Sequence, residues 1–292
     1  MMDMEALRLV LHEIYEQDRQ SLAETGTIKL LERGEQWQLA SVLDAGGVLV
    51  FPHASIIDCG HQQAACVQAA LDCGADTILL VSVLHAFTAE MEAAQARVDA
   101  GGEPSAEVFW GLQGPGIEGP RQEWRGDHVL VSWRYLWDAE LRRRGLPASR
   151  APRVIERYPF LTKGQPENLP GFEELARLAE GAAVVSTADS HHHGAVYGMP
   201  AEEVHEIDSA GLEYARAVLQ EGIDQLSAGD YAAYDGHCQR VVSDARDAGP
   251  VFHALRPQVE GRILELVGSD AQAYFPGEPP PIWVACALVS WE

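Results

Sequence analysis

The stretch Ala182-Ala-Val-Val-Ser-Thr-Ala-Asp-Ser-His-His-His-Gly194 decides how this chain folds. Its first five residues are mostly apolar and form a short run, which is typical of a buried strand. An aspartate and three consecutive histidines follow almost at once. Open α/β sheets bind their ligands just beyond the carboxyl ends of the strands. The stretch therefore predicts a central strand and one edge of a ligand site.

Two earlier stretches repeat this arrangement, because each is an apolar run that ends in a histidine. Residues 46–52 lead into His53, and residues 76–84 lead into His85. Between them, residues 60–73 are rich in Ala and Gln and predict a helix. A strand, a helix and a second strand in this order indicate a right-handed crossover and parallel strands. Neighbouring parallel strands would bring both histidines to the same edge of the sheet.

The rest of the sequence predicts further elements around this centre. Helical spacing or a high content of Ala and Glu predicts helices over about 3–24, ending at Gly26, then 88–100, a segment that ends at Leu141, 171–180, and two pieces within 201–242. Short apolar runs predict strands over 107–112, 128–133, 262–267 and 282–289. Residues 28–40 suggest a hairpin or irregular edge, and 159–170 a surface loop. We expect residues 1–292 to form a single α/β domain with a mixed central sheet and helices on both faces.

Composition narrows the class of partner. The chain has 44 acidic against 21 basic residues and a formal charge of -23. Binding to phosphates requires clustered cations, so nucleic acids and anionic membrane surfaces are disfavoured. No apolar run approaches the roughly 18 residues of a membrane span, and the N-terminus lacks the basic start and apolar run of a secretory signal. A small molecule is the expected partner, and a homo-oligomer is left open.

The five cysteines indicate a reducing compartment. Their number is odd and they lack the paired spacing of zinc motifs, which fits reduced thiols in the cytoplasm. Cys59, Cys66 and Cys73 recur every seven residues, as buried positions on one helix would. The sequence also lacks a Gly-rich phosphate loop, a Gly-x-Ser-x-Gly elbow and a His-Glu-x-x-His motif.

Two histidines and one carboxylate would be a recognisable set of metal ligands. Such a set, with open positions on one side, is typical of non-haem Fe(II) oxygenases. His53 and His85 are the candidate histidines, although each alone could be an ordinary hydrogen-bonded loop residue. The segment 243–250 offers Asp244 and Asp247 as the carboxylate. Both aspartates could instead cap a helix or stabilise its first turn.

The run from His191 to His193 suggests an acid–base residue. The pKa of a histidine lies close to neutral pH, so it can move protons without much tuning. Asp189 could hold one of these imidazoles in a single tautomer. The alternative is a surface turn that happens to be rich in histidine, and the pattern alone does not separate the three histidines.

Several short motifs, taken in order, resemble the Memo family, which shares its fold with the class III extradiol dioxygenases of the LigB type. Phe51-Pro-His-Ala-Ser resembles the Pro-His-Ala-Gly opening of that family, and 77–85 resembles the next strand, which ends in Ser-His-His. Ser186-Thr-Ala-Asp-Ser-His-His-His-Gly194 resembles Ser-Ser-Asp-x-x-His-x-Gly, and 262–270 resembles a late strand. The resemblance places Asp189 and His192 on the Asp and His of the family.

The chain departs from the family at the position of the third ligand. Memo proteins carry Cys-Gly-Arg-x-Pro where this chain has Asp244-Ala-Arg-Asp-Ala-Gly-Pro250. If the family cysteine is matched to Asp244, the proline of this chain falls two residues later than in the family. The resemblance therefore favours Asp244 over Asp247 only modestly. The resulting set of two His and one carboxylate resembles that of the extradiol dioxygenases, whose third ligand is Glu. Ser55 also replaces the family glycine after Pro-His-Ala.

The hypothesis is that His53, His85 and Asp244 bind one Fe(II), with substrate and O2 in the remaining positions. His192, oriented by Asp189, would move a proton to or from the substrate. The resemblance implies oxidation of an aromatic diol or aminophenol. A hydrolase that uses Zn(II) in the same ligand set is the first alternative. The second is a non-enzymatic protein that binds a metal or a peptide, as the resemblance to Memo allows.

Overall fold

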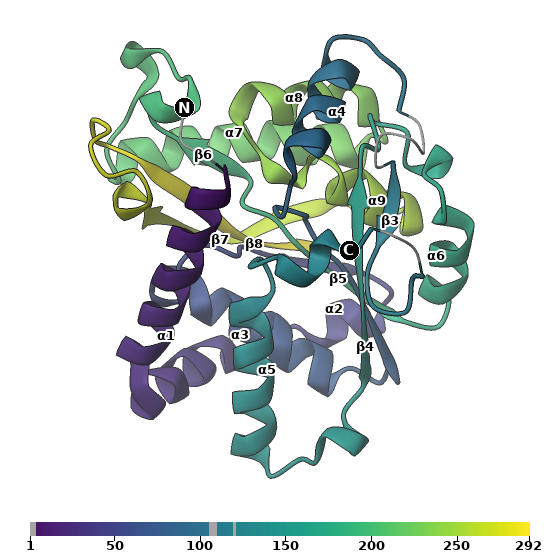
Figure 1. Cartoon of the computed structure of the whole chain (residues 1–292). Coiled ribbons are helices and arrows are strands. Elements are labelled where there is room, and N and C mark those ends of the chain that lie inside the picture. Colours follow the sequence, from purple (N-terminus) through teal and green to yellow (C-terminus); the bar gives the residue numbers. More distant parts are fainter. Residues whose placement is uncertain (1–3, 105–109, 119–120) are drawn as a thin grey trace.

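A mixed eight-stranded sheet forms the centre of the protein, in the order β3-β4-β2-β5-β1-β8-β6 with β7 paired to β8. The computed structural model describes residues 4–104, 110–118 and 121–292, with side chains described for residue 11 and from residue 13 onward (Figure 1). The strands are β1 Val48–Phe51, β2 Thr77–Val81, β3 Gly111–Gln113, β4 Arg153–Phe160, β5 Ala183–Thr187, β6 His191–His193, β7 Gly261–Asp270 and β8 Trp283–Trp291. The predicted α/β class is confirmed.

Strand β5, the strand of the opening stretch, lies between β2 and β1 and runs parallel to both. Val185 pairs with Leu49 on one side and with Leu80 on the other. The strand is buried throughout, as a continuous apolar run in a parallel sheet requires. The parallel arrangement was predicted, but β1 and β2 are not direct neighbours because β5 separates them. The carboxyl ends of all three strands therefore meet at one edge.

Helices cover both faces of the sheet (Figure 1). They are α1 Met4–Glu35, α2 Ala40–Asp44, α3 Ile56–Asp72, α4 Ala89–Asp99, α5 Val131–Arg144, α6 Phe172–Ala179, α7 Ser209–Ser227, α8 Tyr231–Val241 and α9 Ala248–Leu255. Leu49 and Phe51 of β1 pack with residues of α1, α2, α3 and α5, whereas Val48 and Val50 pack on the opposite side with α6 to α9. Alternate residues of one strand thus build two cores.

The first helix departs from the prediction, because α1 continues past Gly26 to Glu35. The expected hairpin or irregular edge over 28–40 is wrong. The helix bends at Ala23, whose backbone angles (φ 48°, ψ −178°) are not helical, and then packs closely on α3. A Cβ atom on Gly34 would lie 2.7 Å from the Ala65 amide nitrogen, so this close approach needs a glycine. Burial of Leu31 against α3 outweighs the low helix propensity of Gly26.

Three further predictions for local structure are corrected. Residues 131–133 begin α5 and are not in a strand, since Trp133, Leu136 and Trp137 are buried at helical spacing. The expected loop from 159 begins after β4, which continues to Phe160. The histidine run forms the short strand β6 against β8 and is not a surface turn. Of the strand predicted over 107–112, residues 107–109 lie outside the described residues, and β3 begins at Gly111.

Among the described residues, none of the helices combines the length and the apolar character needed to cross a lipid bilayer.

Candidate metal centre

Three side chains that are distant in the sequence meet at the carboxyl edge of the sheet. His53 follows β1, His85 follows β2, and Asp244 begins the short 3-10 helix η7, Asp244–Arg246. The Nε2 atoms of the two histidines are 3.1 Å apart, and Asp244 Oδ2 lies 3.0 Å from His53 Nε2 and 3.1 Å from His85 Nε2. Ligand atoms about 2.1 Å from one shared ion lie roughly 3.0–3.4 Å apart in octahedral and tetrahedral sites. The triangle therefore has the dimensions of a metal centre.

The tautomer of His53 also fits metal binding. Its Nδ1 lies 3.0 Å from the hydroxyl oxygen of Thr187, at the end of β5. That hydroxyl donates to the carbonyl of Phe51 at 2.8 Å, so it accepts a hydrogen from His53 Nδ1. The Nε2 lone pair is then left to face the other two ligand atoms. A hydrogen bond that orients an imidazole in this way is the usual support of a metal-binding histidine.

Buried carboxylates hold the backbone at each ligand. Asp127 Oδ2 accepts from the amide nitrogens of His85 at 2.5 Å and of Ala86 at 2.9 Å. Asp189 Oδ1 accepts from the amide nitrogen of His53 at 2.9 Å. Asp244 Oδ1 accepts from the amide nitrogen of Asp189 at 2.8 Å, which leaves Oδ2 for the triangle. The ligands are thus positioned by hydrogen bonds as well as by the strands that precede them.

The electrostatics of the triangle depend on two aspartates. Burial opposes protonation of His53, but the nearby carboxylates of Asp189 and Asp244 outweigh it and raise the pKa of His53 to about 9. Burial alone would raise the pKa of Asp244, but His53 and His85 outweigh that effect and bring the pKa below its ordinary value. Without a metal, a proton on His53 therefore compensates part of the buried negative charge.

Asp247, the other candidate for the third ligand, lies elsewhere. Its carboxylate accepts from the amide nitrogens of Leu161 at 3.1 Å and Thr162 at 2.7 Å, and from the Thr162 hydroxyl at 2.6 Å. These contacts tie the end of β4 to the start of α9. The ambiguity between the two aspartates is resolved by geometry, since only Asp244 faces the two histidines.

His192 lies beside the triangle, in a second group with Asp189 and Asp244 whose ligand atoms are all within 4.8 Å of one another. Its Nδ1 is 2.7 Å from the carbonyl of Val242, which can only accept a hydrogen bond, so Nδ1 carries the hydrogen and Nε2 is free to accept a proton. The expected support from Asp189 is corrected here: Val242 orients the imidazole, because Asp189 is directed to the backbone of His53.

The other two histidines of the run take no part in the triangle. His191 Nδ1 lies 2.9 Å from the Val241 carbonyl, and His193 Nε2 accepts from the amide nitrogen of His205 at 2.7 Å. Alternation along β6 explains the difference, because neighbouring residues of a strand point to opposite faces. His192 is half-buried beside the triangle, whereas His191 and His193 are buried against Trp283.

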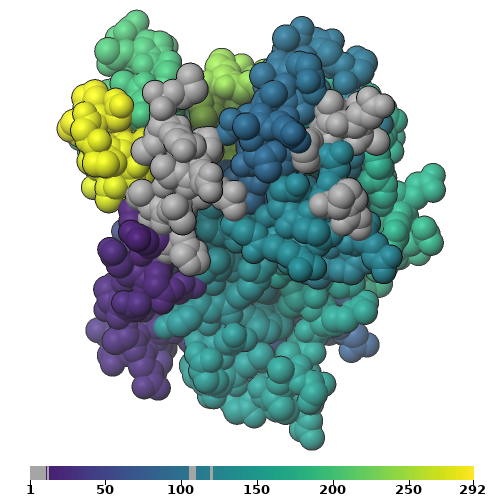
Figure 2. Space-filling view, in the orientation of Figure 1, coloured from purple at the N-terminus to yellow at the C-terminus, as the bar shows by residue number. Residues whose placement is uncertain are grey.

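A cavity of about 180 Å³ adjoins the triangle. Four imidazoles line it, from His53, His85, His128 and His192, together with Asp189 and a wall of aromatic rings. Its walls come from distant parts of the chain: α1, the segment before α4, and the connection between β7 and β8. Figure 2 shows α1, α4 and that connection on one face of the molecule.

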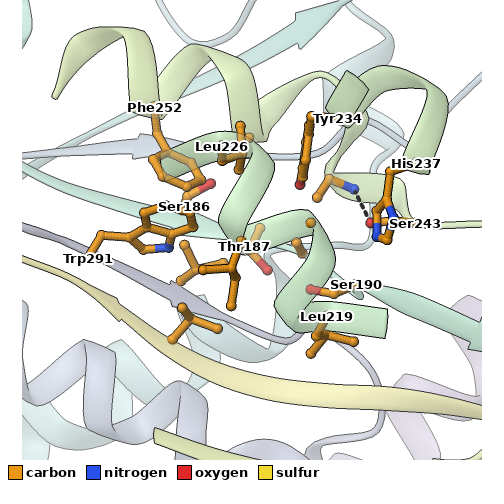
Figure 3. A pocket seen from close by; sticks show the side chains of 17 residues that line it. Ser186, Thr187, Ser190, Leu219, Leu226, Tyr234, His237, Ser243, Phe252 and Trp291 are labelled. Atoms are coloured by element: carbon orange, nitrogen blue, oxygen red, sulfur yellow. Dashed lines mark hydrogen bonds between the residues drawn. The ribbon is translucent and has the colours of Figure 1, made fainter. Parts of the chain in front are cut away.

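A second cavity lies between the sheet and helices α7, α8 and α9, and it measures about 40 Å³. Figure 3 shows Thr187, Ser190 and Ser243 around it, with Tyr234 and His237 of α8. A cavity that holds benzene measures about 150 Å³, so this one has room for water but not for a ring. The 180 Å³ cavity is the candidate substrate site because it has room for a ring and is lined by His53, His85 and His192.

Sequence reasoning missed the supporting residues of the site. Thr187 was part of the opening stretch, and its place directly after a buried strand is the signal that could have identified it. Asp127 and His128 are two ionisable residues next to an apolar run. They were overlooked because the strand predicted over 128–133 included His128. His128 stacks on His85, with ring centroids 5.4 Å apart, and lines the cavity.

No model of a known protein family matches the chain, and a search of curated proteins found no similar sequence.

Proposed function

We propose that the protein is a non-haem Fe(II)-dependent oxygenase or oxidase that uses O2 to oxidise a small aromatic diol or aminophenol. The observation that carries this proposal is the triangle of His53, His85 and Asp244 at the wall of a cavity lined by aromatic rings. Two histidines and one carboxylate are the ligands that such iron enzymes use. The resemblance of the motifs to the Memo family and to the class III extradiol dioxygenases supports the same activity.

An Fe(II) ion held by these residues would acidify a substrate hydroxyl and supply the electron that O2 requires. The protein contributes the proton transfer. His192 has a free Nε2 beside Asp189 and Asp244, and its other nitrogen is held by the Val242 carbonyl. This arrangement suits a base that accepts the hydroxyl proton from the bound substrate and later returns it.

The surroundings of the triangle limit access of water. The side chains of His53 and Asp244 are 2% and 7% exposed, and only His85, at 26%, has a substantial accessible area. A substrate in the cavity would cover that remaining side. Exclusion of water strengthens the electrostatic interactions within the site and protects reactive intermediates from side reactions.

A metal-dependent hydrolase is the alternative, and one observation favours it. The second group, Asp189, His192 and Asp244, shares Asp244 with the triangle. A shared carboxylate between two ligand groups is compatible with a two-metal site, in which two ions stabilise the attacking and leaving oxygens. In that case His192 would be a ligand and not a base.

Metal content tests the two functions against each other. The protein is purified without oxygen, its metals are counted, and oxygen uptake is screened with catechols, aminophenols and thiols. One iron per chain and oxygen consumption with a catechol or aminophenol support the proposal. Two zinc ions per chain with hydrolytic activity support the alternative. Metal binding without any turnover would instead support a non-enzymatic protein and contradict both.

The proposal places the enzyme in the cytoplasm. All five cysteines are buried free thiols, which supports a reducing compartment. Measuring the free thiols of the protein isolated under acid quench tests this placement, and a disulfide found there would contradict it.

A further inference from the structure

We propose that the cavity selects an uncharged, single-ring substrate and rejects a ring that carries a carboxylate. This inference rests on the proposed function, because it specifies the substrate class of the same site. Three properties of the cavity lead to it: its volume, its aromatic walls and the sign of the charges that face it.

The volume sets the size of the ligand. The cavity measures about 180 Å³. Sites for drug-sized ligands measure about 300–1,000 Å³, whereas a cavity of about 150 Å³ accommodates benzene. A single six-membered ring with two small substituents therefore matches the volume of the cavity better than a fused or biaryl system does.

The walls favour a flat aromatic ligand. Five aromatic rings line the cavity besides the imidazoles, and they belong to Tyr15, Phe87, Tyr197, Tyr274 and Phe275. Tyr197 contacts His192 and Phe275 edge-on, with ring centroids 5.1 Å and 5.4 Å apart. Such tilted neighbours leave ring faces and edges for a further aromatic group, which prefers offset or edge-on contacts.

The charges of the described lining residues disfavour a second anionic group on the substrate. Among the described residues that line the cavity there is no Lys or Arg, and Asp189 contributes a carboxylate. Asp189 and Asp244 would balance a divalent ion, and none of the described lining residues supplies a further positive charge for a substrate carboxylate. Arg246 follows Asp244 closely in the sequence, but its guanidinium already binds Asp235 and Asp99, each at 2.5 Å. A buried carboxylate without a cationic partner is strongly disfavoured.

Equilibrium binding tests the inference without turnover. Metal-free protein is titrated under nitrogen at pH 7, by calorimetry, with catechol and with 3,4-dihydroxybenzoate, which differ by one carboxylate. We expect catechol to bind at least about a hundredfold more tightly, as for other groups left unpaired in a buried site. Equal or tighter binding of the carboxylated ring, or binding of neither compound, would overturn the inference.

Two variants test the charge argument by adding a positive charge to the wall of the cavity. Leu11→Arg places a cation at the cavity wall, and Phe275→Lys does so from another wall if the first variant folds poorly. Either should narrow the preference for catechol at least about tenfold by providing the carboxylate with a partner. Ile28→Arg is the matched control, because it adds the same charge to α1 at an exposed position outside the cavity and should leave the preference unchanged.

The two proposals fail in different ways. Oxygen uptake by the iron-loaded protein with 3,4-dihydroxybenzoate but not with catechol would retain the oxygenase and overturn the inference on the substrate. Selective binding of catechol by a protein that consumes no oxygen would retain the selectivity of the cavity and contradict the oxygenase.

Discussion

Two clusters of imidazoles lie at the same end of the sheet, and their surroundings are opposite in character. In the triangle, His53 and His85 meet the carboxylate of Asp244, and the three candidate ligand atoms face one another within 3.1 Å. In the second cluster, His191 and His193 meet each other and the backbone near His205, with no carboxylate in any of these hydrogen bonds.

The second cluster is a complete chain of neutral hydrogen bonds. The amide nitrogen of His205 donates to His193 Nε2, so the hydrogen of His193 is on Nδ1 and points to His191 Nε2, 3.2 Å away. His191 Nδ1 then donates to the Val241 carbonyl. Each ring nitrogen of the two imidazoles has one partner, and an additional proton would have none.

The pKa values follow this difference. Burial, together with the neighbouring histidines, lowers the pKa of His191 and of His193 to about 4. Burial by itself would also lower the pKa of His53, but the carboxylates of Asp189 and Asp244 outweigh burial and raise this pKa to about 9. The carboxylate partners thus distinguish the proposed metal site from a structural cluster of the same residue type.

The largest expected effect is the loss of the metal from the triangle. His53→Ala removes one of three ligands and should weaken iron binding by about 300-fold or more. This figure takes the binding free energy of a structural zinc site and divides it equally among the ligands. His193→Leu is the matched change in the other cluster and should retain iron while lowering the free energy of unfolding. Iron counted per chain after gel filtration measures both. Stoichiometric iron in His53→Ala would contradict the triangle.

His192→Gln should come next. The variant can still donate a hydrogen bond to Val242 but cannot accept a proton, so oxygen consumption with a catechol should fall by about a hundredfold or more, while iron content stays the same. Loss of iron along with activity would instead make His192 a ligand, as the two-metal alternative requires.

Metal affinity should depend on pH through His53. Below about pH 9 the ion must displace a proton from this histidine, so the apparent affinity should fall about tenfold per pH unit and about a hundredfold from pH 9 to pH 7. Competition of Zn(II) with a chelator of known pH dependence measures this. A flat profile over that range would show that His53 is neutral in the metal-free protein.

Thr187→Val should have a smaller effect on the same quantity. It removes the acceptor of the His53 Nδ1 hydrogen with little change in volume, and loss of such support typically weakens metal binding by about 10–100-fold. Ser186→Ala, on the neighbouring residue of β5, is the control, since its hydroxyl donates to Val81 and not to a ligand. Equal losses in both variants would indicate a general effect on the strand.

Acid should destabilise the second cluster. The unfolded chain takes up protons on His191 and His193 near pH 6.5, but the folded protein does so only near pH 4. The contribution of these two histidines to the free energy of unfolding is therefore fully present above about pH 6.5. It is lost as the pH falls toward 4, by on the order of 3 kcal/mol for each histidine. The raised pKa of His53 acts in the opposite direction, and its contribution in the metal-free protein is lost as the pH rises through about 9. Urea unfolding of the wild type and of His193→Leu across pH 4–7 tests this, and parallel profiles would contradict it.

The centre of the fold could be predicted because its signals are local. The apolar runs that became β1, β2 and β5 are continuous, and their order with a helix between implies parallel strands. The predictions failed where packing outweighed local preference. Gly26 did not end α1, because α1 packs on α3, and the segment after His128 became α5, because Trp133 and Trp137 are buried. The third histidine-bearing segment pairs with β8, a strand about ninety residues later, which local pattern does not reveal.

The sequence by itself determined which ionisable side chains follow the buried strands, because strand ends can be read from runs of neighbouring residues. Only the tertiary structure decided which of these atoms meet. His85 and Asp244 are 159 positions apart. Asp244 and Asp247 are three positions apart, yet only Asp244 faces the histidines, whereas Asp247 binds Leu161 and Thr162. The tautomers of His53 and His192 likewise depend on Thr187 and Val242, which are distant in the sequence. Contacts of this kind arise from packing of the whole chain, and no local periodicity encodes them.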